Sequence, residues 1–137
     1  MSGDSTAELL TAIRTRLLAD AALSAIVGIR VFDMPPQTIV YPYVQMGDVQ
    51  SNVFEDGACI DGSELFLDFH TWARGQQPAT QMHGMNKAIR DSLHGQRFTV
   101  AGHTLQAIEH QTTRTLRDPD GITRHGVVTF RAFTTAA

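Results

Sequence analysis

The chain has 137 residues, of which 42% are hydrophobic and 18% are charged, and its formal net charge is −3. This length predicts a single domain over residues 1–137, and the composition predicts a packed core rather than a disordered chain. No apolar run approaches the roughly 20 residues of a membrane-spanning helix, and no signal peptide is recognisable. The sequence also lacks the dense basic patch that is typical of nucleic-acid-binding proteins. We therefore expect a soluble protein, made inside the cell, that has neither a membrane nor a specific nucleic acid as its partner.

A helix with one buried face is predicted near the N-terminus. Ser5 and Glu8 have the spacing of a capping box, in which two side chains satisfy free backbone N–H groups at the start of a helix. Apolar residues then recur every four positions, at Leu9, Ile13 and Leu17. A short second helix is predicted over residues 20–27, ended by Gly28 in a left-handed conformation.

Three strands follow, of which the third is the clearest. They are predicted over residues 29–32, 43–50 and 64–72. In the third, Leu65, Leu67 and Phe69 alternate with polar residues, so they share one face of the strand. We expect this face to pack on the helices, against Ile13, Leu17, Met85 and Ile89.

The second half of the chain repeats the order of helix and strands. A helix is predicted to begin at Pro78 and to end at Gly95. A hairpin is predicted from strands 98–101 and 104–108, and a last pair of strands is joined by the turn 118–121. The residues expected to point inward from this pair are Ile122, Gly126, Val128, Phe130 and Ala132. The sequence therefore predicts an α+β fold: a mainly antiparallel or mixed β-sheet with two α-helices packed on one face.

The sequence carries no recognised catalytic motif. It has no H-E-x-x-H, G-x-S-x-G, P-loop or G-x-G-x-x-G pattern. Asp118 to Gly121 resembles the start of a calcium loop, but the glycine comes too early, which indicates a turn. Cys59, the only cysteine, is interpreted as a small apolar residue rather than a nucleophile, and His70 as a surface or interface group. We therefore expect no catalytic residue, no metal and no cofactor.

The charges are distributed unevenly, and this asymmetry indicates a candidate contact surface. Residues 31–73 hold seven acidic residues and no Lys or Arg, whereas eight basic and four acidic residues follow from residue 74. We predict that residues 52–63 form a flexible acidic loop that becomes ordered on assembly, or else that Phe54 and Ile60 extend the core beneath a hairpin. A solvated acidic surface is the simpler alternative. The proposed contact residues are Phe54, Glu55, Asp56, Asp61, Arg114, Arg117 and Arg124.

The order of short motifs along the chain resembles that of the tail completion (tail terminator) proteins of long-tailed phages and gene transfer agents. In the first half, the motifs are Leu17-Leu18-Ala19-Asp20-Ala21-Ala22-Leu23, Val27-Gly28, Arg30-Val31-Phe32-Asp33, Pro35, Tyr41-Pro42-Tyr43-Val44 and Gly47. In the second half, they are His70-Thr71-Trp72-Ala73-Arg74, Leu93-His94-Gly95, Ala101-Gly102-His103, Arg114-Thr115-Leu116-Arg117-Asp118-Pro119-Asp120-Gly121 and Phe130-Arg131-Ala132. Together they span nearly the whole chain.

The resemblance implies a virion protein, assembled in the host cytoplasm, that forms a ring, expected to be a hexamer. Such a ring caps the head-proximal end of the tail tube, stops its growth and joins the tail to the head–tail connector or stopper protein. The alternatives within the same class are a neighbouring neck protein or a tube protein. A small metal-dependent hydrolase and a monomeric adaptor are the alternatives from other classes.

Overall fold

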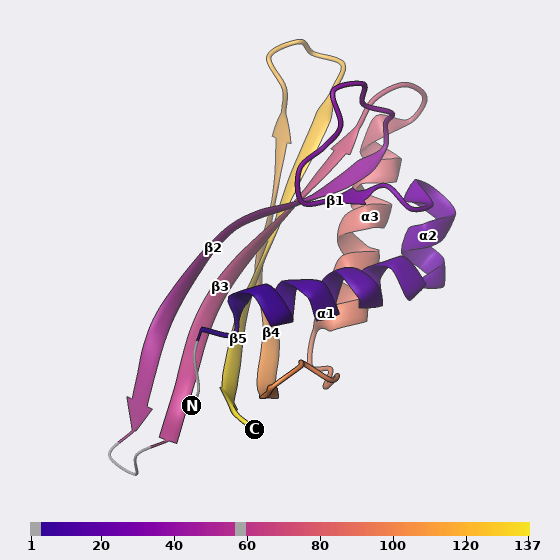
Figure 1. Cartoon of the computed structure of the whole chain (residues 1–137). Helices are drawn as coiled ribbons and strands as arrows, with labels where there is room; N and C mark the ends of the chain where they lie inside the picture. The colour runs from indigo at the N-terminus through magenta and orange to yellow at the C-terminus, as the bar shows by residue number, and fades with distance from the viewer. Residues whose placement is uncertain (1–3, 57–59) are drawn as a thin grey trace.

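The described residues form three helices and five strands. The structure is a computed structural model that describes residues 4–56 and 60–137, and their side chains outside residues 54–61. The helices are α1 (Thr6–Ala19), α2 (Ala21–Val27) and α3 (Pro78–Leu93). The strands are β1 (Val31–Phe32), β2 (Tyr43–Asp56), β3 (Ile60–Ala73), β4 (His103–Arg117) and β5 (Arg124–Ala136). Figure 1 shows these elements along the chain.

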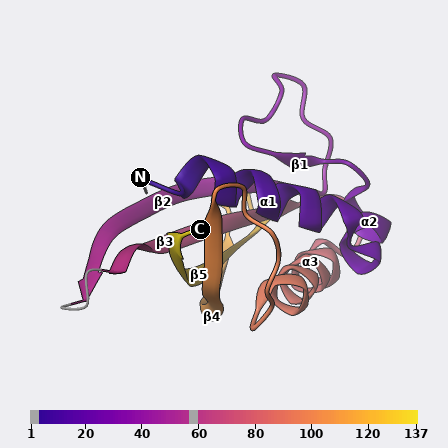
Figure 2. The ribbon, with the colours of Figure 1, turned by 60° about the horizontal axis from the view of Figure 1, so that its bottom comes forward.

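The strands make one mixed sheet in the order β1-β2-β3-β5-β4. The short β1 is parallel to β2, and every other neighbouring pair is antiparallel. Buried side chains from all three helices join those of the sheet's inner face in a single cluster, and Figure 2 shows the helices along the sheet. The predicted α+β fold is confirmed.

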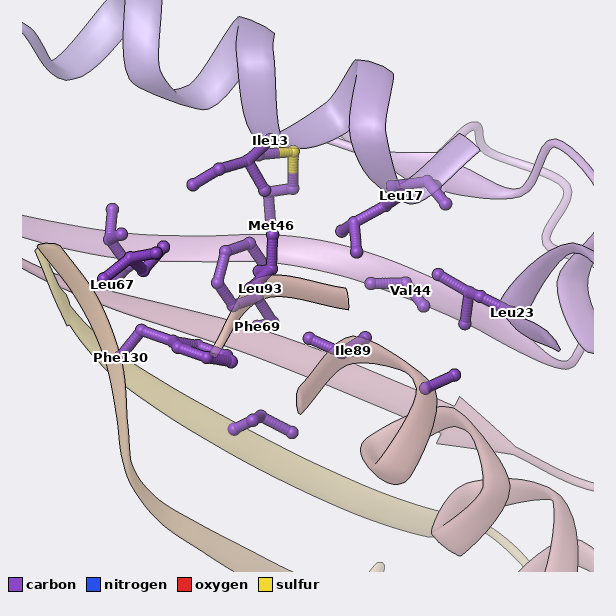
Figure 3. Packing of buried hydrophobic residues seen from close by; sticks show 14 of the residues in the cluster. Ile13, Leu17, Leu23, Val44, Met46, Leu67, Phe69, Ile89, Leu93 and Phe130 are labelled. Carbon is purple, nitrogen blue, oxygen red and sulfur yellow. The ribbon is translucent and has the colours of Figure 1, made fainter. Parts of the chain in front are cut away.

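The expected core contacts are also confirmed. Leu65, Leu67 and Phe69 are at most 1% exposed and belong to the same buried cluster as the four predicted helix residues. The ring of Phe69 meets that of Phe130 edge to face, with 5.7 Å between the centroids. Figure 3 shows Ile13 and Leu17 of α1 above these strands and Ile89 of α3 beside them. The apolar residues that alternate along β3 and those that recur every four positions along α1 therefore pack in one core, as the two periods predict.

The predicted capping box at the start of α1 is wrong. Ser5 makes no capping hydrogen bond; its hydroxyl is buried and bonds instead to the hydroxyl of Thr134 in β5 at 2.6 Å. Asp4 accepts a hydrogen bond from the backbone N–H of Thr6 at 3.0 Å. Burial against β5 thus draws the Ser5 side chain away from the helix end. At α2 the helix ends at Gly28 as predicted and the φ of this residue is +60°, but its ψ of −122° lies outside the left-handed helical region.

Residues 52–56 and 60–63 belong to paired strands rather than to a loop, which corrects the first prediction for them. β2 and β3 remain paired from Tyr43↔Trp72 as far as Asp56↔Ile60. The alternative of a hairpin fits the backbone, whereas the side chains of Phe54 and Ile60, and Cys59 as a whole, lie outside the described residues. The loop was predicted from the polar residues of this segment. A strand whose backbone is paired, however, does not need apolar side chains.

Two further predictions in the second half are wrong. Residues 98–101 form no strand; Val100 makes an isolated bridge with His103, where β4 begins and runs to Arg117. Ile122 is 59% exposed rather than inward. The Asp120 carboxylate accepts hydrogen bonds from the N–H groups of Ile122 and Thr123, which holds Ile122 in the turn before β5 starts.

Replacing Gly126 by Ala should lower the free energy of unfolding by about 1–3 kcal/mol. A Cβ at this position would lie 2.4 Å from Thr71 Oγ1 and 2.6 Å from Asn86 Oδ1, two atoms that share a buried 2.6 Å hydrogen bond. The added methyl group must displace that bond between β3 and α3. Urea unfolding measures the change. Gly84→Ala is the matched control and should cost less, because its nearest neighbour is the terminal methyl of Ile26 at 3.0 Å.

Candidate subunit interface

The predicted acidic contact residues lie at one end of the sheet. Glu55 and Asp61 are directly opposite each other in the β2–β3 pair, one step before its last described pair. We call residues 53–56 and 60–63 the acidic end. Figure 1 shows the β2–β3 pair extending past α1 toward this end. Val53, within it, is 79% exposed, so an apolar side chain lies on the surface of the acidic end.

The three predicted arginines lie at the opposite end of the sheet, which we call the arginine end. Arg117 and Arg124 are cross-strand partners at the close of the β4–β5 pair, and Arg114 lies opposite Val127. Ala73, the last residue of β3, pairs with Arg124. Asp61 and Ala73 are twelve residues apart on β3, which is about 40 Å in an extended strand. The acidic end and the Arg117–Arg124 pair therefore cannot touch within one subunit.

The structure separates Arg114 from the other two arginines. Arg117 and Arg124 line a cavity of about 350 Å³ together with Ala79 and His83 of α3, so they face the helices. The pairing of Arg114 with Val127, between the inward-facing Gly126 and Val128, puts it on the other face of the sheet. Both bulges of β4 lie before Thr112, so the regular alternation of a strand already puts Arg114 and Arg117 on opposite faces, and strand pairing adds Arg124 opposite Arg117.

None of these three arginines has a described partner. In the part of the chain that the structure describes, none forms an ion pair or a side-chain hydrogen bond. By contrast, Arg74 pairs with Asp120 at 3.0 Å, and Arg131 pairs with Glu64. Arg117 and Arg124 also place like charges opposite each other, which is destabilising in an antiparallel pair. The arginine end therefore has a favourable place for an external anion.

At the arginine end, one step from the Arg117–Arg124 pair, the outer face of the sheet carries a cluster of aromatic rings. The His125 ring stacks on Trp72 with 3.8 Å between centroids, and a nitrogen of His125 lies 2.7 Å from one of His70. Burial, with the nearby His70 and Arg114, lowers the pKa of His125 against the opposing effect of Asp118. His70 is therefore an internal hydrogen-bonding partner of another imidazole rather than a free surface group. A Cβ on Gly47 would lie 2.6 Å from the His70 ring, so this arrangement requires glycine there.

Two exposed apolar residues lie beside the arginines, and the sequence analysis did not predict their exposure. Leu116 is 44% exposed and Ile122 is 59% exposed, on either side of the Arg117–Arg124 pair. Leu116 also lines the cavity of Arg117 and Arg124, so an apolar side chain borders the two charges. Their signal in the sequence was ambiguous, because an apolar residue next to a strand is ordinarily assigned to the core.

Among the side chains that the structure describes, those of residues 4–53 and 62–137, no three from His, Cys, Asp or Glu gather in a group that could hold a metal ion. Among the described helices, none has the length and hydropathy to cross a membrane.

The family model and the curated relative that match this chain carry the same description. The family described as tail completion protein gp17 matches residues 11–135. The tail completion protein gp17 of Bacillus phage SPP1 is 28% identical over 102 residues, which are 74% of each chain.

Two solved structures are similar to this fold. A chain in the virion of a native gene transfer agent particle has a TM-score of 0.88 and 24% identity, covering 98% of this chain and all of that one. The bacteriophage SPP1 gp17 protein has a TM-score of 0.61 and 25% identity, covering 93% of this chain and 88% of that one. The resemblance seen in the sequence motifs is confirmed: the chain belongs to the family of tail completion protein gp17, structural proteins of the phage tail.

Proposed function

We propose that the protein forms a ring on the head-proximal end of the tail tube, stops polymerisation of the tube and joins the tail to the head–tail connector or stopper protein. The observation that carries the proposal is the family match over residues 11–135. The ring assembles in the host cytoplasm, remains in the virion and contains six copies. Its partners are further copies of itself, the tail tube protein and the connector.

The separation of the two charged ends supports a ring. A ring is built from heterologous contacts, in which one surface of a subunit meets a different surface of the next. The acidic end and the arginine end are different, oppositely charged and too far apart to neutralise each other within one subunit. We propose that they form the contact between copies, through Phe54, Glu55, Asp56, Asp61, Arg114, Arg117 and Arg124.

Purified protein mixed with tube assembled from the tail tube protein should form closed rings at the tube ends and should prevent further growth. Negative-stain images of the mixture test both results, and light scattering gives the oligomeric state of the free protein. Long stacks of the protein by itself would instead indicate a tube protein. Only monomer in solution, combined with one copy per virion, would contradict the ring.

A further inference from the structure

A cavity of about 350 Å³ at the arginine end has the composition of an anion site. It lies between the first turns of α3, through Ala79 and His83, and the ends of β4 and β5, through Arg117 and Arg124. The other residues that line it are Met82, Thr115 and Leu116. Two guanidinium groups on adjacent strands thus share one recess in the surface.

Positive charge in this recess is left uncompensated. Arg117 and Arg124 face each other across the strand pair without an ion pair to any described residue. The first turn of α3 contains no acidic residue, so the positive end of the helix dipole adds to the same charge.

The nearest acidic groups of the turn have other partners. The Asp120 carboxylate accepts hydrogen bonds from the hydroxyl and the N–H of Thr123 and from the N–H of Ile122, and it pairs with Arg74; these contacts lower its pKa to about 2. Asp118 accepts a hydrogen bond from the backbone N–H of Asp120. Neither Asp118 nor Asp120 is among the residues that line the cavity.

We propose that this cavity binds carboxylates from the acidic end of a second copy of the chain. Guanidinium groups bind carboxylates with two parallel hydrogen bonds, so two arginines can hold two of the acids Glu55, Asp56 and Asp61. The distance of about 40 Å along β3 requires that the acids come from another subunit. This inference rests on the proposed ring and narrows its contact to Arg117 and Arg124, because Arg114 faces away from the cavity.

Zero-length cross-linking of the assembled protein tests the contact directly. In an Arg117→Lys/Arg124→Lys variant, a carbodiimide can join each new amine to a carboxylate that touches it. Lys87 is the only lysine of the unaltered chain, so the wild type is the control. With equal parts of ¹⁴N- and ¹⁵N-labelled protein, we expect mass spectrometry to find mixed-isotope links from 117 or 124 to 55, 56 or 61. Links to other carboxylates only, or links within one copy only, would overturn the contact.

Charge reversal separates this inference from the proposed function. Arg117→Glu/Arg124→Glu should weaken self-association about tenfold or more, whereas Arg90→Glu/Arg97→Glu, with the same change of charge at two exposed positions, should not. Adding Glu55→Lys/Asp56→Lys to the first variant should restore assembly. Normal rings from Arg117→Glu/Arg124→Glu would overturn the contact alone; absence of rings from the wild type would overturn the ring as well. Loss of binding to a DNA oligomer in that variant, with normal rings, would assign the cavity to phosphate groups instead.

Discussion

Truncating Phe69 to Ala is expected to lower the free energy of unfolding by about 3–5 kcal/mol. Phe69 has no exposed surface, and its ring packs edge to face on Phe130 in the centre of the sheet. Removing the ring leaves a cavity under α1 and α3, which the surrounding side chains can fill only in part. Chemical denaturation followed by circular dichroism measures the loss.

Phe66→Ala is the matched control for this prediction. Phe66 lies in the same strand three residues earlier, on the outer face, and is partly exposed. Its truncation should cost about 1 kcal/mol or less, because the side chain keeps much of its contact with water in the folded state. Equal losses for the two variants, or an unchanged stability of Phe69→Ala, would contradict the assignment of the inner face.

Replacing Glu55, Asp56 and Asp61 together by Ser should leave the subunit folded and prevent ring formation or attachment to the tail. All three residues belong to the acidic end, where Glu55 and Asp61 are backbone partners in the β2–β3 pair. Removing like charges from one strand pair does not destabilise the subunit. A contact with the arginine end, however, loses its attraction. Thermal unfolding tests the fold, and negative-stain images of rings test the assembly.

Asp33→Ser/Asp48→Ser/Glu109→Ser is the control for the triple variant, because it changes the net charge equally at three exposed acids outside the acidic end. It should form rings normally. Wild-type rings should also weaken between low and high salt, since exposed ion pairs are screened. Normal assembly of the acidic-end variant at both salt concentrations would show that its carboxylates are only a solvated surface.

The sequence by itself determined the helices, the inner face of β3 and the family. Leu9, Ile13 and Leu17 follow the period of a helix, and Leu65, Leu67 and Phe69 follow the period of a strand. All six are buried, because burial of apolar surface is the dominant favourable contribution to the free energy of folding. A regular period puts these residues on one face, where they can be buried together. The end of α2 was also predictable from Gly28 itself, because glycine adopts a positive φ without strain.

Only the tertiary structure decided features that depend on a residue distant in sequence. Ser5 bonds to Thr134 rather than to its own helix, and β2 continues to Asp56 because β3 lies beside it. The same holds for the proposed interface. The charges of Arg114, Arg117 and Arg124 are evident in the sequence, but strand pairing puts the last two in one cavity and the first on the opposite face. A local pattern specifies the period of an element, whereas the partners of its polar groups are set by the strands and helices that the fold brings alongside it.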